Sequence, residues 1–98
     1  MTKRNELKEI TEKLIPLLKK HNVTKAGIFG SYARGDQTKK SDVDILIELD
    51  NKVSLLGFIR LKNILEDEIN KKIDLVEYSL IRKELRNRIL NEEIAIIR

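Results

Sequence analysis

Gly30-Ser31-Tyr32-Ala33-Arg34-Gly35 is followed, after five polar residues, by Ser41-Asp42-Val43-Asp44. Seven positions of this stretch carry the pattern: Gly30, Ser31, Arg34, Gly35, Ser41, Asp42 and Asp44. With roughly 5–7% usage for each residue type, these seven residues at this spacing would arise by chance about once in a billion starting positions. Glycine and serine let a backbone approach phosphate closely, and paired carboxylates bind hard cations. The stretch therefore indicates a selected site that combines a phosphate cradle with metal-binding carboxylates.

The second half of this stretch begins a strand. Apolar residues occupy every second position from Val43 to Leu49, which predicts a strand over 42–49 with one face in the core. Asp42 and Asp44 then share the opposite face, roughly 7 Å apart. Like charges at this distance need a cation or solvent between them. An isolated Asp-x-Asp is common on protein surfaces, but beside the glycine-serine segment it favours a metal site.

The rest of the chain alternates between helical and strand patterns, which predicts an α+β (mixed α/β) fold. Pro16 predicts a kink or a restart in the first helix. Asp50-Asn51-Lys52 is expected to form a turn, with Ser54 capping the helix that follows. The tail 94–97 either continues the last helix or forms an edge strand, and its β-branched residues favour the strand. The expected helices are 5–21, 55–70 and 80–91, and the expected strands are 25–29, 42–49, 73–77 and 94–97.

Composition narrows the function classes. A length of 98 residues predicts one domain over 1–98, and the absence of cysteine with a single histidine excludes disulfides, thiolate sites and a zinc cluster. No apolar run approaches a membrane span and no signal peptide is visible, so we expect a cytoplasmic protein. The net charge of +4 favours acidic partners. Lysine and glutamate are mixed along the helices, however, which does not favour direct nucleic-acid binding.

Asp74 interrupts the apolar run of the third expected strand. If this strand lies beside the second, Asp74 joins Asp42 and Asp44 in a three-carboxylate cluster. Such a cluster can hold two Mg²⁺ ions, an arrangement suited to phosphoryl or nucleotidyl transfer. The alternative is an edge-strand aspartate that faces water.

The glycine-serine segment supplies the candidate phosphate ligands. Gly30 allows close backbone approach, and Ser31 begins a short turn or helix whose N–H groups and hydroxyl can face an anion. Arg34 either reaches phosphate oxygens or holds the aspartate loop through a bidentate ion pair, and both roles stay open. Ser31 and Ser41 have no partner base, since His21 is the only histidine. The basic residues of the last helix form either a solvated face or a docking surface for an acidic partner: Arg82, Lys83, Arg86 and Arg88.

At these residues the chain resembles the minimal nucleotidyltransferases of the DNA polymerase beta-like superfamily. The glycine-serine motif matches Gly30 and Ser31, the paired catalytic aspartates match Asp42 and Asp44, and the third acidic position matches Asp74 by its strand context. The resemblance implies a small mixed β-sheet of three to four strands flanked by helices. It also implies that ATP binds with Mg²⁺ and that AMP is transferred to an acceptor hydroxyl with loss of pyrophosphate.

The resemblance further implies a partner, because larger relatives hold the acceptor on an added helical domain that this chain lacks. In the minimal family the partner is a HEPN-domain RNase toxin, and the nucleotidyltransferase acts as antitoxin by adding AMP to a toxin tyrosine. Two alternatives remain. The acceptor is RNA or a small molecule, or the protein masks the toxin stoichiometrically without turnover.

Overall fold

The predicted elements appear in the predicted order in the computed structural model, which describes residues 2–50 and 53–98. The expected turn at residues 50–52 falls partly outside this range. The elements are α1 (Lys3–Lys20), β1 (Val23–Phe29), α2 (Gly30–Arg34), β2 (Val43–Leu49), α3 (Leu55–Ile69), β3 (Ile73–Glu77), the 3₁₀ turn η1 (Tyr78–Leu80), α4 (Lys83–Glu92) and β4 (Ile94–Ile97).

The four strands form one mixed sheet in the order β3-β2-β1-β4. Strand β1 pairs antiparallel with both β2 and β4, whereas β2 and β3 are parallel and are joined through α3. The predicted mixed sheet flanked by helices is therefore confirmed. The tail forms an edge strand, as its β-branched residues predict.

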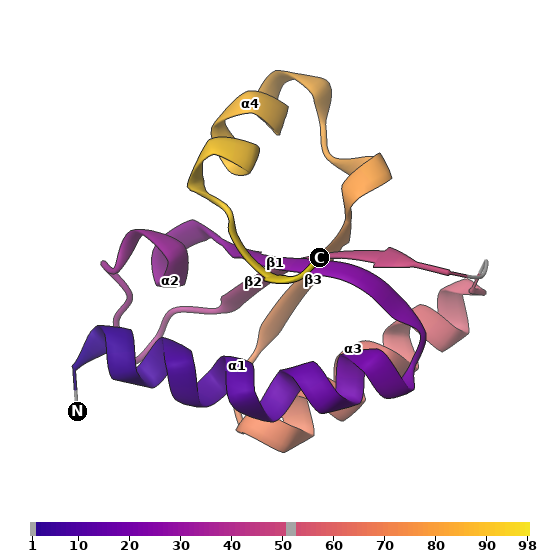
Figure 1. Cartoon of the computed structure of the whole chain (residues 1–98), viewed down its shortest axis with the longest axis horizontal. Coiled ribbons are helices and arrows are strands. Elements are labelled where there is room, and N and C mark those ends of the chain that lie inside the picture. The colour runs from indigo at the N-terminus through magenta and orange to yellow at the C-terminus, as the bar shows by residue number, and fades with distance from the viewer. Residues whose placement is uncertain (1, 51–52) are drawn as a thin grey trace.

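Helices α1 and α3 cover one face of the sheet (Figure 1). Ser54 caps α3, since its hydroxyl accepts a hydrogen bond from the Gly57 amide at 3.1 Å. Every second residue of β2 points into the core beneath these helices, as the sequence pattern predicts. The fully buried residues of this core include Leu14, Leu18, Ala26, Ile28, Val43, Ile45, Ile47 and Leu65.

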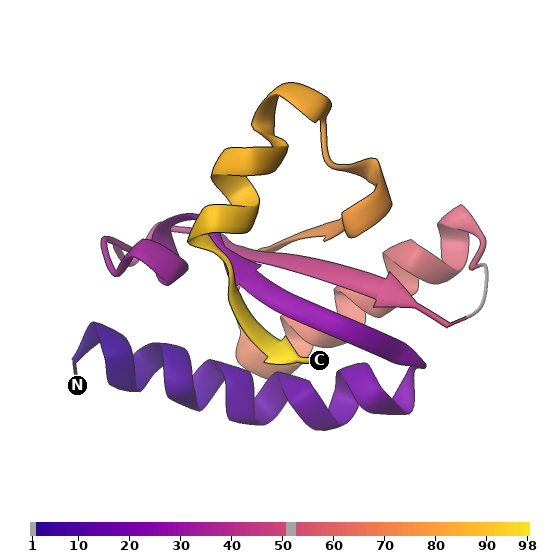
Figure 2. The same ribbon diagram turned by 45° about the horizontal axis from the view of Figure 1, so that its top comes forward.

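Among the described residues, η1 and α4 arch over the opposite face (Figure 2). Its apolar contacts are few and centre on Phe29, Leu46 and Ile81. Helix α4, every residue of which is described, contributes no fully buried side chain. This sheet face is therefore the one with space for a ligand.

Two local expectations are refined. Helix α1 is continuous through Pro16, which lies on its exposed side, while Leu14 and Leu18 hold the helix against the sheet. The last helix begins at Lys83 rather than near Leu80, because the buried Ile81 and the following residue have non-helical backbone angles. Within the described residues, no helix is long and apolar enough to cross a membrane.

Candidate active site

Asp44 lies near the start of β2, on the sheet face beneath α4. On β2 it is paired with Phe29 of β1 on one side and with Asp74 of β3 on the other. Asp42 precedes β2 and, by strand alternation, projects to the same side. The sheet topology thus places Asp74 beside the paired aspartates, as expected if the third strand adjoins the second.

The environment of Asp44 disfavours its charged form. Burial is the main factor that raises the pKa of Asp44 from 3.8 to about 6, and the charges of Asp74 and Asp42 raise it further, against the opposing effect of Arg34. A half-buried carboxylate with two acidic neighbours is suited to bind a cation or to hold a proton. The pKa shift therefore marks Asp44 as the centre of a candidate functional site.

The three aspartates line one cavity of about 670 Å³ between the sheet and α4. The start of α2, including Gly30 and Ser31, forms the adjoining wall, and Ser41 contributes from the loop before β2. Much of the remaining lining is apolar. It consists of Phe29, Val76, Leu80, Ile81, Leu85 and Ile89, with arginines interspersed.

Gly30 joins β1 to α2 with a left-handed backbone angle, φ +72°. A β-carbon at this position would overlap the Asp44 carboxylate. Gly35 ends α2 with φ +81° and lets the chain reverse toward the aspartates. Ser41 shapes the end of this loop, since its hydroxyl accepts a hydrogen bond from the Thr38 amide at 2.8 Å. Glycine is therefore required at residue 30 both for the backbone angle and for the close approach to Asp44.

Arg34 is held by carboxylates on two sides. Its Nε donates to Asp36 at 3.2 Å, and its Nη1 donates to the two carboxylate oxygens of Glu92 at 3.2 and 3.1 Å. These hydrogen bonds raise the pKa of Arg34, and the bond to Asp36 has the largest effect. Arg34 thus contacts the loop after α2 through Asp36 and helix α4 through Glu92. Its role toward phosphate stays a prediction.

Asp42, Asp44 and Asp74 provide hard oxygen donors of the kind that Mg²⁺ prefers. A cation between them would also relieve the repulsion that raises the pKa of Asp44. Across residues 2–50 and 53–98, no three acidic, histidine or cysteine side chains are close enough to form a preassembled metal cluster. The donor set therefore fits Mg²⁺ by its chemistry and its shared cavity, without a compact arrangement of side chains.

Comparison with known proteins agrees with this geometry. Residues 12–98 match the family model described as "Polymerase beta, Nucleotidyltransferase". The chain belongs to this family. It is 46% identical over 91 residues to a Methanocaldococcus jannaschii relative named for protein adenylyltransferase activity, with 93% of this chain and 98% of the relative covered. The protein is thus a nucleotidyltransferase that is similar to protein adenylyltransferases over almost its whole length.

Solved structures share the nucleotidyltransferase fold. A structure described as a minimal nucleotidyltransferase has a TM-score of 0.80 and 31% identity, covering 96% of this chain and 95% of its own. A chain from a toxin–antitoxin structure with AMP-PNP has a TM-score of 0.78 at 23% identity, covering 88% of this chain and 71% of its own. A chain from a complex of tri-AMPylated Shewanella oneidensis HEPN toxin with MNT antitoxin has a TM-score of 0.72 at 18% identity, covering 92% and 71%. At these identities, the similarity to the last two chains shows a shared fold and nothing further.

Three charged residues of this candidate site were not predicted from the sequence as site residues. Arg82 and Arg88 line the cavity, although their spacing indicated only a basic helix face. Glu92 lies one helical turn beyond Arg88 on the same side of α4, and its side chain reaches α2. The i, i+3, i+4, i+7 spacing of Leu85, Arg88, Ile89 and Glu92 is the available sequence signal. Tyr32, which lies inside the glycine-serine segment, is buried in the main core.

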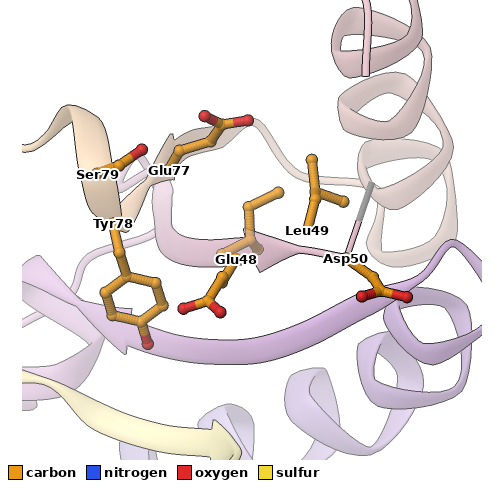
Figure 3. A pocket seen from close by; sticks show the side chains of 7 residues that line it. Glu48, Leu49, Asp50, Glu77, Tyr78 and Ser79 are labelled. Carbon is orange, nitrogen blue, oxygen red and sulfur yellow. The ribbon is translucent and has the colours of Figure 1, made fainter. Parts of the chain in front are cut away.

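A second cavity of about 300 Å³ lies at the far end of β2, away from the nucleotidyltransferase aspartates. Glu48, Asp50 and Glu77 line it together with Tyr78, whose hydroxyl donates to Glu93. Glu48 and Tyr78 extend to one side of the sheet and Glu77 to the other (Figure 3). Because these carboxylates diverge, the second cavity does not provide a converging set of metal ligands.

Proposed function

We propose that this protein transfers AMP from ATP to a hydroxyl group, most specifically to a tyrosine of a HEPN-domain RNase toxin, and that it thereby acts as an antitoxin. The observation that carries the proposal is the convergence of Asp42, Asp44 and Asp74 with the start of α2 in one cavity. This cavity combines acidic metal ligands with backbone amides and a serine hydroxyl suited to a triphosphate.

In this proposal Asp42, Asp44 and Asp74 hold two Mg²⁺ ions, which when bound would stabilise charge on the attacking and leaving oxygens. Gly30 allows the triphosphate to approach the backbone, and Ser31 donates its hydroxyl to a phosphate oxygen. Asp74, on the cavity side of β3, orients the acceptor hydroxyl and can take its proton. The acceptor oxygen bonds to the α-phosphorus, the bond to the β-phosphate breaks, and pyrophosphate leaves.

The partner part of the proposal has two supports. The described residues form a single sheet with its helices, and in this proposal the acceptor brings its own binding surface. The relatives similar in sequence are named for protein adenylyltransferase activity, and the similarly folded chains come from toxin–antitoxin complexes, one of them with an AMPylated HEPN toxin. A protein hydroxyl is therefore the favoured acceptor over RNA or a small molecule.

The proposal is tested by mixing the full chain with the HEPN protein encoded by a neighbouring gene, ATP and MgCl₂. Mass spectrometry of the HEPN protein should show one or more added AMP units, located on tyrosine by peptide mapping. Omission of MgCl₂ with added EDTA should abolish the addition. The modified toxin should stay inactive as an RNase after this protein is removed.

Two results would redirect the proposal. Unmodified toxin that regains RNase activity on separation indicates a stoichiometric mask. Labelling of RNA or a metabolite by α-³²P-ATP, with no label on the toxin, indicates a nucleotidyltransferase with a different acceptor. Asp44→Asn is the matched control, since a mask should tolerate this substitution and an enzyme should not.

A further inference from the structure

Glu92 is the residue through which α4 contacts α2. One carboxylate oxygen accepts a hydrogen bond from the Gly30 amide at 3.3 Å, and both oxygens accept from Arg34 Nη1 at 3.2 and 3.1 Å. Gly30 and Arg34 are the first and last residues of α2. A single side chain from a distant part of the sequence therefore holds both ends of this short helix.

The remaining contacts of Arg34 complete this arrangement. Its Nε donates to Asp36, in the loop that leads from α2 to the aspartates. Arg34 thus links Glu92 on one side to that loop on the other. Glu92 is the less exposed member of its ion pair, with 20% of its side chain exposed against 47% for Arg34. An ion pair with one partly buried carboxylate and more than one hydrogen bond is better defined than an exposed pair.

We propose that Glu92 is a positioning residue for the nucleotide: it fixes Arg34 and α2 so that Gly30 and Ser31 face the triphosphate. This role rests on the proposed function, since it concerns the same cavity. Glu92 acts through Arg34 and the Gly30 amide and does not touch the reacting atoms. Gly30 has no side chain, so its amide contact with Glu92 supplies a restraint that residue 30 cannot supply by packing.

The alternative is that Glu92 competes with the triphosphate for the same donors. The two roles predict opposite signs. A positioning residue strengthens nucleotide binding, so its loss should weaken binding. A competing carboxylate occupies the cradle, so its loss should tighten binding. The sign of the change on Glu92→Gln therefore decides between them.

The experiment measures AMP-PNP binding to the full chain by calorimetry in MgCl₂, together with kcat and KM for ATP in toxin modification. Glutamine retains an oxygen for the Gly30 amide but loses the charged contact with Arg34. Glu92→Gln should raise Kd and KM about tenfold. It should change kcat less than about threefold, because no group at the reacting atoms is removed. Glu12→Gln, on the exposed surface of α1, should leave all three values unchanged.

Non-additivity separates positioning from general destabilisation. Arg34→Gln should weaken binding at least as much, and Glu92→Gln should add less than about twofold in that background, because Glu92 acts through Arg34. If Glu92→Gln unfolds, Arg34→Lys provides the second test: it keeps the charge but lacks the guanidinium fork, and should also raise Kd about tenfold.

Several results overturn the inference. Unchanged or tighter AMP-PNP binding by a folded Glu92→Gln variant rejects the positioning role of Glu92. The role is also rejected if the effects of Glu92→Gln and Arg34→Gln on the binding free energy add fully in the double variant. In the second test, Arg34→Lys binding with wild-type affinity rejects it. A wild-type chain that binds no AMP-PNP overturns the proposed function and this inference together, whereas normal wild-type binding with an unaffected Glu92→Gln variant overturns the inference alone.

Discussion

Gly30 leaves no room for a side chain beside the carboxylate of Asp44. The contact joins the turn after β1 to the start of β2, so the phosphate side and the metal side of the candidate site share one boundary. A substitution at residue 30 therefore acts on Asp44 even before a nucleotide is considered.

The comparison of Gly30→Ala with Gly35→Ala isolates this contact. Both glycines have positive φ, so each alanine costs ~1 kcal/mol in backbone strain. A β-carbon at Gly35 would meet no described atom within 4 Å, whereas one at Gly30 meets Asp44. Gly35→Ala should lose about that much stability and keep AMP transfer. Gly30→Ala should lose more stability and reduce AMP transfer at least ~100-fold, as measured by urea unfolding and toxin labelling. Equal activities of the two variants would contradict the importance of the Gly30–Asp44 contact.

Asp44→Asn should abolish AMP transfer while the protein stays folded. Asparagine keeps the volume of the side chain but removes the ligand charge, so we expect a rate at least ~1,000-fold lower. Circular dichroism checks the fold, and mass spectrometry of the toxin checks the reaction. Near-wild-type AMP labelling of the toxin by a folded Asp44→Asn variant would contradict the proposed metal site.

The stability of the metal-free protein should depend on Asp44 in a defined pH window. The folded-state pKa of about 6 exceeds the ordinary 3.8, so the protonated form stabilises the fold below about pH 4 and this contribution is lost as the pH rises through 6. The ionised Asp44 carboxylate then lowers the free energy of unfolding by ~3 kcal/mol if it is fully shielded from solvent, or by about 1–2 kcal/mol if it is half-exposed. With EDTA, Asp44→Asn should be more stable than wild type at pH 8 by this amount and equal to it near pH 4. Denaturant unfolding at both pH values tests this, and a gain of equal size at both would refute it.

Asp74 should influence the titration of Asp44 directly. The two residues are register partners on parallel strands, and the Asp74 charge is the largest electrostatic contribution that raises the pKa of Asp44. Asp74→Asn should therefore lower the pKa of Asp44 toward its ordinary value, as followed by carboxyl carbon NMR without metal. Glu48→Gln, at the other end of β2, serves as the control and should leave the pKa of Asp44 unchanged. An Asp44 pKa that does not respond to Asp74→Asn would argue against their electrostatic coupling.

Local sequence patterns predicted most of the fold and the acidic part of the site. Alternation along β2 predicted which face carries Asp42 and Asp44. The position of Asp74 in an apolar run marked it as a candidate third carboxylate, and the pairing of β2 with β3 places it beside Asp44. Glu92 was not predicted, because its contact with Arg34 depends on the pairing of β1 with β4. That pairing joins distant parts of the chain, and periodicity contains no information about it. The same limit applies to Arg82 and Arg88, whose helix shows its basic side in sequence but not the cavity beneath it.

The antiparallel pairing of β1 with β4 also has a consequence for local unfolding. Gly30 directly follows β1 and Glu92 shortly precedes β4, so their meeting depends on hydrogen bonds at the edge of the sheet. Because α4 has no fully buried side chain, it opens more readily than α1 or α3, and its amides should exchange with solvent before those of β2. Fraying of β4 would loosen the α4 wall of the cavity and withdraw Ile97 from the margin of the main core. Access to the aspartates is therefore coupled to α4 and β4, without any hinge in the strands that carry the aspartates.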